Sequence, residues 1–106
     1  MDEVYLTEEI ISTMQKIPKK IYTSRYNDIQ RIVLGDKIIV LTFHAIKQAR
    51  KRFIDAQMVK TAILGGKIKR FGKKYIRFKK YYKNIGVQCI GEIINGTVII
   101  KTITWC

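Results

Sequence analysis

The dipeptide Asn95-Gly96 separates two runs rich in β-branched residues, VQCIGEII and TVIIKTITW. Asn-Gly between such runs is the strongest short signal for a two-residue β-hairpin, because both residues tolerate the positive φ angles of a type I′ turn. The turn also sets the register, so that Ile94 faces Thr97. The chain is therefore expected to contain an antiparallel sheet, and this requirement limits its fold more than any other feature does.

Both faces of this hairpin are partly apolar. One face is predicted to collect Val87, Cys89, Ile93, Val98 and Ile100, and the other Ile90, Ile94, Ile99, Ile103 and Trp105, interrupted by Glu92 and Lys101. Strands that are apolar on both faces lie in the middle of a sheet. We therefore expect a central hairpin that helices cover on one side and that is only partly covered on the other.

The rest of the chain alternates between the helical and the strand period. The predicted elements are a helix over 5–17, a hairpin over 31–41 that turns at Gly35-Asp36, a helix over 42–53 that Thr42 caps, a helix that Asp55 caps and Gly65-Gly66 ends, and the strands KIKRF and KYIRFKKYY. These patterns predict a single α+β domain over 1–106. Its predicted order is an N-terminal helix and hairpin, a helix pair, then an antiparallel sheet of three to four strands.

The charge of the chain is strongly basic and unevenly distributed. The formal net charge is +13, and four of the eight acids lie within the first nine residues. Residues 56–91 contain no acid at all. Such a balance favours a polyanionic partner, which can be RNA, DNA, an acidic protein or an anionic membrane surface.

Other classes of function have little support in the sequence. No stretch is long and apolar enough to span a bilayer, and the acidic N-terminus lacks a signal-peptide core, so we expect a cytoplasmic protein without a membrane partner. Two cysteines and the single histidine, His44, offer no metal-ligand cluster, and no cofactor is predicted. Cys89 is predicted to be a core residue and Cys106 an exposed thiol.

The decapeptide KKYIRFKKYY (73–82) is the main candidate for the surface that binds a polyanion. It contains five cations and three tyrosines but no acid. In a strand, one face carries Tyr75, Arg77, Lys79 and Tyr81, and the other carries Ile76 and Phe78 among its residues. Burying two unpaired cations costs several kcal/mol each, so the first set is predicted to face outward. Alternating cations and rings suit phosphates and bases, and the alternative is a solvated face whose tyrosines serve β-propensity.

Residues 44–68, HAIKQARKRFIDAQMVKTAILGGKI, are followed by strand-like runs that close in ITW. This arrangement resembles small uncharacterised domains of the RelE-like toxin clan, which includes BrnT-type ribonuclease toxins. The matching residues are His44, Arg52, Ile54, Asp55, Val59, Leu64 and Gly66. The resemblance covers 44–106 as a RelE-like core and leaves 1–43 as an N-terminal extension. The chain departs from the pattern at Gln48, a position that is often basic in such domains.

The resemblance implies a metal-independent endoribonuclease toxin or an inactive relative of one. Such toxins cleave mRNA, often on the ribosome, and are neutralised by an acidic antitoxin. Such cleavage uses the 2′-OH as nucleophile and needs a base, cations around the phosphorane and an acid for the leaving oxygen. The candidate catalytic residues are His44 as acid or base, Arg77 as phosphate clamp, Lys79 as charge stabiliser or base, and Tyr81 as stacking platform or proton donor. The candidate nucleic-acid contacts are Arg52, Lys69, Arg70, Lys74 and Tyr75.

Two other functions fit the same residues. A non-enzymatic nucleic-acid-binding or host-interaction protein of viral or plasmid origin would use the same basic face without turnover. A structural interaction module would bind an acidic protein there. Binding and catalysis both require arginine, lysine and tyrosine, so the sequence leaves these alternatives open.

Overall fold

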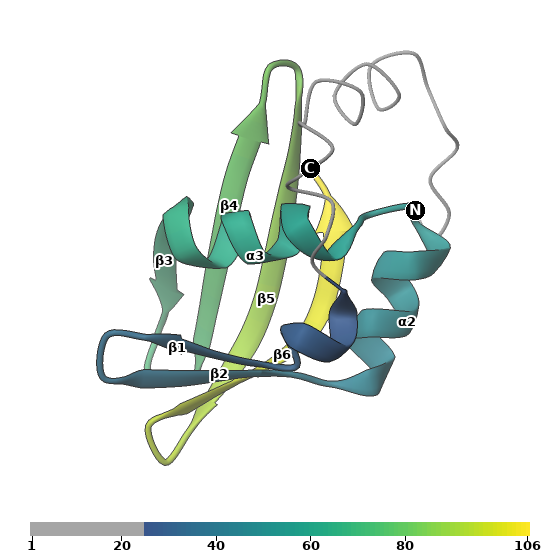
Figure 1. Cartoon of the computed structure of the whole chain (residues 1–106). Coiled ribbons are helices and arrows are strands. Elements are labelled where there is room, and N and C mark those ends of the chain that lie inside the picture. Colours follow the sequence, from purple (N-terminus) through teal and green to yellow (C-terminus); the bar gives the residue numbers. More distant parts are fainter. Residues whose placement is uncertain (1–24) are drawn as a thin grey trace.

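The computed structural model describes residues 25–106 (Figure 1). The elements in chain order are a 3₁₀ turn η2 (Tyr26–Asp28), strands β1 (Arg31–Leu34) and β2 (Lys37–Leu41), helices α2 (Phe43–Lys51) and α3 (Ala56–Gly65), and strands β3 (Lys67–Phe71), β4 (Tyr75–Tyr82), β5 (Ile85–Ile94) and β6 (Thr97–Trp105). The predicted α+β class is confirmed. The helix predicted over 5–17 lies outside the described residues.

The sheet is larger than predicted, and it is mixed. Six strands form one sheet in the order β1-β2-β6-β5-β4-β3, so the prediction of three to four antiparallel strands was wrong. The hairpin predicted over 31–41 forms as β1 and β2, but it joins the sheet through parallel pairing of β2 with β6. The other neighbouring strands pair antiparallel. A parallel pair leaves no turn signal in the sequence, because a long crossover connects its two strands.

The C-terminal hairpin has the predicted turn and the predicted central position. Asn95 and Gly96 have φ angles of 49° and 79°, and Ile94 pairs with Thr97. These positive φ angles are those of a type I′ turn. Strands β5 and β6 lie in the middle of the sheet, with two strands on either side. This position explains why the hairpin is apolar on both faces.

A β-bulge corrects the predicted orientation of the end of β6. The pairing register shifts between Ile90 and Gly91, which leaves Lys101 as an extra residue on β6. The extra residue reverses the alternation that follows it. Ile103 is therefore fully buried in the core, and Trp105 packs against the core, whereas strict alternation predicted the opposite face for both.

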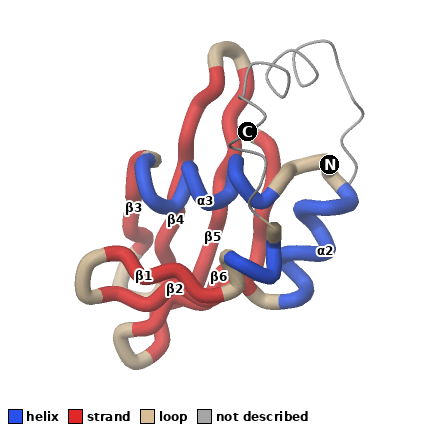
Figure 2. Tube along the Cα trace, in the orientation of Figure 1, coloured by secondary structure: helices blue, strands red, loops and turns tan. Residues whose placement is uncertain are grey.

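Both helices cover the same face of the sheet (Figure 2). Helix α3 lies across β4 and β5, and α2 lies beside β6. The predicted caps are confirmed, since Thr42 Oγ1 accepts from Ala45 N at 3.1 Å and Asp55 Oδ1 accepts from Met58 N at 2.9 Å. Fully buried side chains between the layers include Phe78, Ile39, Ile63, Ile76 and Ile100. No helix of residues 25–106 covers the opposite face, which we call the open face.

Helix α2 protects the edge of β6 where β2 ends. The pairing of β2 with β6 stops at Ile100, so the next backbone groups of β6 need other partners. Gln48 Oε1 accepts from Ile103 N at 3.4 Å, and Arg52 Nη1 donates to Ile103 O at 2.7 Å. Arg52 is buried, and its own carbonyl accepts from Trp105 Nε1 at 2.7 Å. Arg52 therefore provides the hydrogen-bond donor that the backbone carbonyl of Ile103 lacks at this edge of the sheet.

No helix of residues 25–106 is long and apolar enough to cross a membrane. The same residues contain no group of three or more His, Cys, Asp or Glu side chains that could hold a metal ion.

Both cysteines are free thiols, and they lie where predicted, with Cys89 buried and Cys106 exposed. Burial raises the pKa of the Cys89 thiol to about 12.

Candidate nucleic-acid interface

Strand β4 has the orientation that its alternation predicted. Ile76 and Phe78 are fully buried on the helix side of the sheet. On the same side, the hydroxyl of Tyr82 donates to Met58 O of α3 at 3.3 Å. The four side chains on the open face are Tyr75 and Tyr81, which are 48% and 58% exposed, and the partly exposed Arg77 and Lys79 between them.

Strand β3 extends this surface across the edge of the sheet. The antiparallel register places Lys67, Lys69 and Phe71 of β3 opposite Lys79, Arg77 and Tyr75 of β4, in that order. Directly opposite residues point to the same face of a sheet, so these β3 side chains join the open face. All five residues of β3 are exposed. We call the resulting surface the basic-aromatic patch; it consists of Lys67, Lys69, Phe71, Tyr75, Arg77, Lys79 and Tyr81.

Three cations of the patch lie against its aromatic rings. Lys69 Nζ and Arg77 Cζ are each 5.4 Å from the centroid of the Phe71 ring. Lys79 Nζ is 4.9 Å from the centroid of the Tyr81 ring. Contacts of this kind contribute about 0.5–1 kcal/mol at exposed sites, enough to favour one orientation of a long side chain. The ion pairs found among residues 25–106 involve none of the patch cations, so their charge is positioned but not neutralised.

Arg77 also carries a donor without a partner. Its Nε is buried, yet it donates to no acceptor in the described part of the chain. Leaving a buried donor unpaired costs about 1–3 kcal/mol, more when the group is charged. Because Nε itself is buried, an anion bound on the open face would accept from the other nitrogens of this guanidinium group.

The strands contribute one acid to the open face, Glu92 of β5, which lies directly opposite Tyr75. Its Oε2 accepts from Lys101 Nζ at 2.7 Å, and its Oε1 lies 3.8 Å from Lys74 Nζ. The hydrogen bond from Lys101 holds the pKa of Glu92 below its usual value and raises the pKa of Lys101. Glu92 is therefore ionised at neutral pH, in the midst of a basic surface.

The structure does not bring the four predicted catalytic residues together. Arg77, Lys79 and Tyr81 lie side by side on the open face. His44 lies in α2, on the helix side of the sheet, where it is exposed and its Nε2 is 3.0 Å from Gln48 Nε2. A reaction on the open face would therefore have to proceed without His44.

The predicted nucleic-acid contacts are divided in the same way. Lys69 and Tyr75 belong to the basic-aromatic patch, and Lys74 lies next to it in the turn between β3 and β4. Arg70 pairs opposite the buried Ile76 and so points to the helix side of β3. Arg52 is the buried residue that closes the edge of β6.

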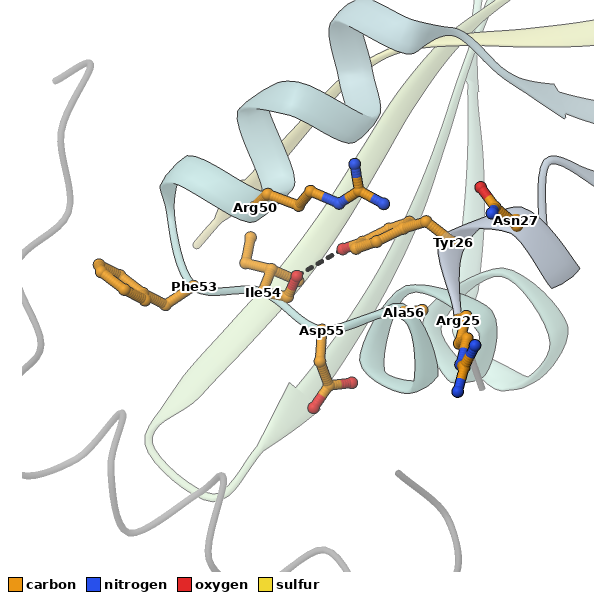
Figure 3. Close-up of a pocket in the computed structure, with 8 residues that line it drawn as sticks. All are labelled: Arg25, Tyr26, Asn27, Arg50, Phe53, Ile54, Asp55 and Ala56. Carbon is orange, nitrogen blue, oxygen red and sulfur yellow. Dashed lines mark hydrogen bonds between the residues drawn. The ribbon is translucent and has the colours of Figure 1, made fainter. Parts of the chain in front are cut away.

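A second candidate site is an open pocket of about 470 Å³ on the helix side (Figure 3). Its lining comes from the start of η2, the end of α2, the connection between α2 and α3, and the first residue of α3. It consists of Arg25, Tyr26, Asn27, Arg50, Phe53, Ile54, Asp55 and Ala56. The buried hydroxyl of Tyr26 donates to Ile54 O, and Arg50 Cζ is 5.3 Å from the centroid of the Tyr26 ring. Burial raises the pKa of Tyr26 well above its usual value. These contacts hold η2 against the helix pair.

Several polar groups of this pocket already form contacts that stabilise the fold. Phe53, in the connection after α2, has a φ angle of 59°, and its ring is 51% exposed. Asp55 caps α3 through Oδ1, while its Oδ2 is buried without a partner among the described residues, and burial raises the pKa of this carboxyl group. Three cations of the basic-aromatic patch, in contrast, contact rings of the exposed patch itself, and none of the patch cations forms an ion pair within residues 25–106. We therefore place the candidate interface on the open face.

Three residues of this surface were missed from the sequence. The period of two in KIKRF puts Lys67 and Phe71 on the same face as Lys69 and puts Arg70 on the other face, so this signal could have found both residues. Glu92 had no signal of its own, because only the pairing of β4 with β5 places it opposite Tyr75.

Comparisons of the chain with protein-family models, with curated proteins and with solved structures found no match.

Proposed function

We propose that the protein binds single-stranded nucleic acid on the open face of its sheet. The observation that carries this proposal is the register of β3 on β4, which gathers four cations around three aromatic rings. None of these cations forms an ion pair with a carboxylate of the described part of the chain. Cations neutralise phosphates, and rings on an open sheet stack on bases that are not paired to a second strand. Tyr75 and Tyr81 are about half exposed and accessible for such stacking.

Endoribonuclease activity is the second candidate, and it is the activity that the resemblance of residues 44–68 to RelE-like toxins implies. The observation that favours it is the close grouping of Arg77, with its unpaired Nε, and the Lys79–Tyr81 contact at 4.9 Å. Arg77 would hold the scissile phosphate, Lys79 would stabilise the phosphorane or take the 2′-OH proton, and Tyr81 would donate a proton to the leaving oxygen. An acidic partner such as an antitoxin would compete with RNA for this patch.

Binding is tested by fluorescence anisotropy with a single-stranded RNA, the DNA of the same sequence and the corresponding RNA duplex. We expect the single strands to bind more tightly than the duplex, because stacking requires exposed bases. Equal affinity for the duplex would show that shape and charge alone are recognised. Absence of binding to all three at low salt would contradict the proposal.

Cleavage is tested by incubating the purified protein with a single-stranded RNA in EDTA. If the second candidate is right, the RNA is cut, Lys79→Ala loses cleavage, and His44→Ala retains it because His44 lies on the other side of the sheet. Intact RNA, bound at concentrations where the complex is saturated, would leave a non-enzymatic binding protein. Loss of cleavage in His44→Ala at unchanged affinity would contradict the assignment of the reaction to the open face.

A further inference from the structure

Among residues 25–106, the one acid that the strands place on the open face lies beside an aromatic ring that has no cation over it. Phe71 has Lys69 and Arg77 over its ring, and Tyr81 has Lys79. No cation–ring contact of this kind was found for Tyr75 within residues 25–106, although its side chain is 48% exposed. Tyr75 is therefore the ring of the patch whose face is most accessible to a base.

Backbone pairing brings Glu92 close to this ring. Ile93 N donates to Lys74 O at 2.6 Å, so residues 74 and 93 form a hydrogen-bonded pair. Hydrogen-bonded and non-hydrogen-bonded pairs alternate along an antiparallel ladder, which makes Tyr75 and Glu92 a non-hydrogen-bonded pair. Side chains approach most closely in such pairs, with Cβ atoms about 4.5–5.5 Å apart. A base stacked on Tyr75 would have its edge beside the carboxylate.

The carboxylate has acceptor capacity left for this edge. Oε2 accepts one hydrogen bond, from Lys101, and Oε1 accepts none from the described residues, since Lys74 Nζ is 3.8 Å away. Each carboxylate oxygen can accept about two hydrogen bonds. The side chain of Glu92 is only 15% exposed, so a base can reach its carboxylate only if the neighbouring lysines move aside. The side chains of Lys74 and Lys101 are 70% and 55% exposed, so both can move without burying a charge.

We propose that Tyr75 and Glu92 form a base-recognition subsite that selects guanine, with Tyr75 stacking on the ring and Glu92 accepting hydrogen bonds from its Watson–Crick edge. This inference rests on the proposed binding of single-stranded nucleic acid. Guanine presents N1–H and an N2 amino group side by side, the same fork of donors with which arginine binds a carboxylate. Adenine and cytosine place a ring-nitrogen acceptor beside their amino group, and uracil flanks its N3–H with two carbonyl groups. An ionised carboxylate repels those acceptors, so guanine alone offers it two donors.

The test uses fluorescence anisotropy with uridine-rich single-stranded RNA that carries one central guanosine, inosine, adenosine or uridine. The oligonucleotides are 2′-O-methylated at the central residue so that attack by its 2′-OH cannot occur. A bidentate contact is expected to favour guanosine over adenosine and uridine by about tenfold or more. Inosine, which lacks the N2 amino group, is expected to bind with intermediate affinity.

Three variants assign the preference to the carboxylate. Glu92→Gln replaces one acceptor by a donor, so the guanosine preference is expected to fall to about threefold or less. Asp36→Asn removes the same charge at an exposed turn and should leave the preference unchanged. Lys101→Met removes the 2.7 Å ion pair with Glu92 but keeps the carboxylate, so retention of the preference would separate base recognition from a structural role of this ion pair.

The failure of this inference is distinguishable from failure of the proposed function. Salt-dependent binding of all four oligonucleotides within about twofold would overturn guanine recognition while the open face still binds RNA. A guanosine preference that survives in Glu92→Gln would also overturn it. If none of the oligonucleotides binds at low salt, the proposed function itself fails.

Discussion

Replacing Arg77 and Lys79 together by alanine should weaken RNA binding without unfolding the protein. Both side chains lie on the open face and are partly exposed, and the core beneath them is formed by their neighbours Ile76 and Phe78. The substitution leaves every backbone pair of β4 in place. It does remove the contacts of Arg77 with Phe71 and of Lys79 with Tyr81, which contribute about 0.5–1 kcal/mol each at exposed sites.

The magnitude follows from the number of phosphates that the patch can neutralise. The patch contains four cations, Lys67, Lys69, Arg77 and Lys79. For single strands the slope of log K against log salt is about −0.7 per phosphate contact, so four contacts give about −2.8 and two give about −1.4. Between 50 and 200 mM salt, the affinity should fall about 50-fold for the parent protein and about sevenfold for the double variant. The slopes of the two proteins differ by about 1.4, so the double variant should bind about 25-fold more weakly than the parent protein at 0.1 M salt if the two bind equally at 1 M.

The assay is a salt titration of RNA binding by fluorescence anisotropy, with circular dichroism to establish that each variant is folded. The matched control is Lys47→Ala/Lys60→Ala, which removes the same charge from α2 and α3 on the helix side. Its slope should equal that of the parent protein. Equal slopes for the parent and the Arg77/Lys79 variant, or a reduced slope in the control alone, would refute the reasoning.

Three further predictions concern the fold and its pH dependence. Gly96→Val should lower the melting temperature, because a β-branched residue is strained at a φ angle of 79°, and an unchanged melting temperature would contradict this. Arg52→Met should cost about 1–3 kcal/mol in chemical denaturation, because it leaves the carbonyl of Ile103 unpaired, while the folded variant binds RNA like the parent. Asp55→Ala should cost about 1 kcal/mol, because it removes the cap on Met58 N, whereas Asp55→Asn keeps the cap. Burial raises the pKa of Asp55 above about 3.8, the ordinary value of the carboxyl group. The free energy of unfolding of the parent should therefore fall relative to that of Asp55→Asn as the pH rises from about 3.8. Parallel pH profiles of unfolding for the two proteins would contradict this.

Several features of residues 25–106 could be predicted because the residues that specify each of them are close together in the sequence. The caps at Thr42 and Asp55, the turn at Asn95-Gly96 and the orientation of β4 each depend on residues within a few positions of one another. The end of α3 is similar, since a Cβ on Gly66 would lie 2.6 Å from Lys79 O, and Gly-Gly signals this stop in the sequence. In each case, side-chain chemistry and backbone geometry specify the same structure.

The number and order of strands could not be predicted in this way. Pairing of β2 with β6 joins Ile39 to Val98 across most of the described chain, and both strands are simply apolar in sequence. Nothing local distinguishes a separate N-terminal hairpin from one that extends the sheet. The bulge at Lys101 could not be predicted either, because no particular residue type marks the extra residue of a bulge in this strand.

The candidate site was predicted only where one strand supplied it. Tyr75, Arg77, Lys79 and Tyr81 lie in one strand, and period two groups them correctly. Lys67, Phe71 and Glu92 join them only through cross-strand pairing. His44 was selected by residue type, which carries no information about the side of the sheet on which the residue lies.

The central claim is that nucleic acid binds the open face, and photocrosslinking tests it most directly. The measurement is ultraviolet crosslinking of a 4-thiouridine-substituted single-stranded RNA, followed by mass spectrometry of the crosslinked peptides. Exposed aromatic rings occur on both sides of the sheet. Phe71, Tyr75 and Tyr81 lie on the open face, whereas Phe43 begins α2 and Phe53 lies in the connection after it. We predict crosslinks to Phe71, Tyr75 or Tyr81 that excess unlabelled RNA abolishes. Crosslinks confined to Phe43 or Phe53 would place the bound RNA on the helix side and contradict the claim.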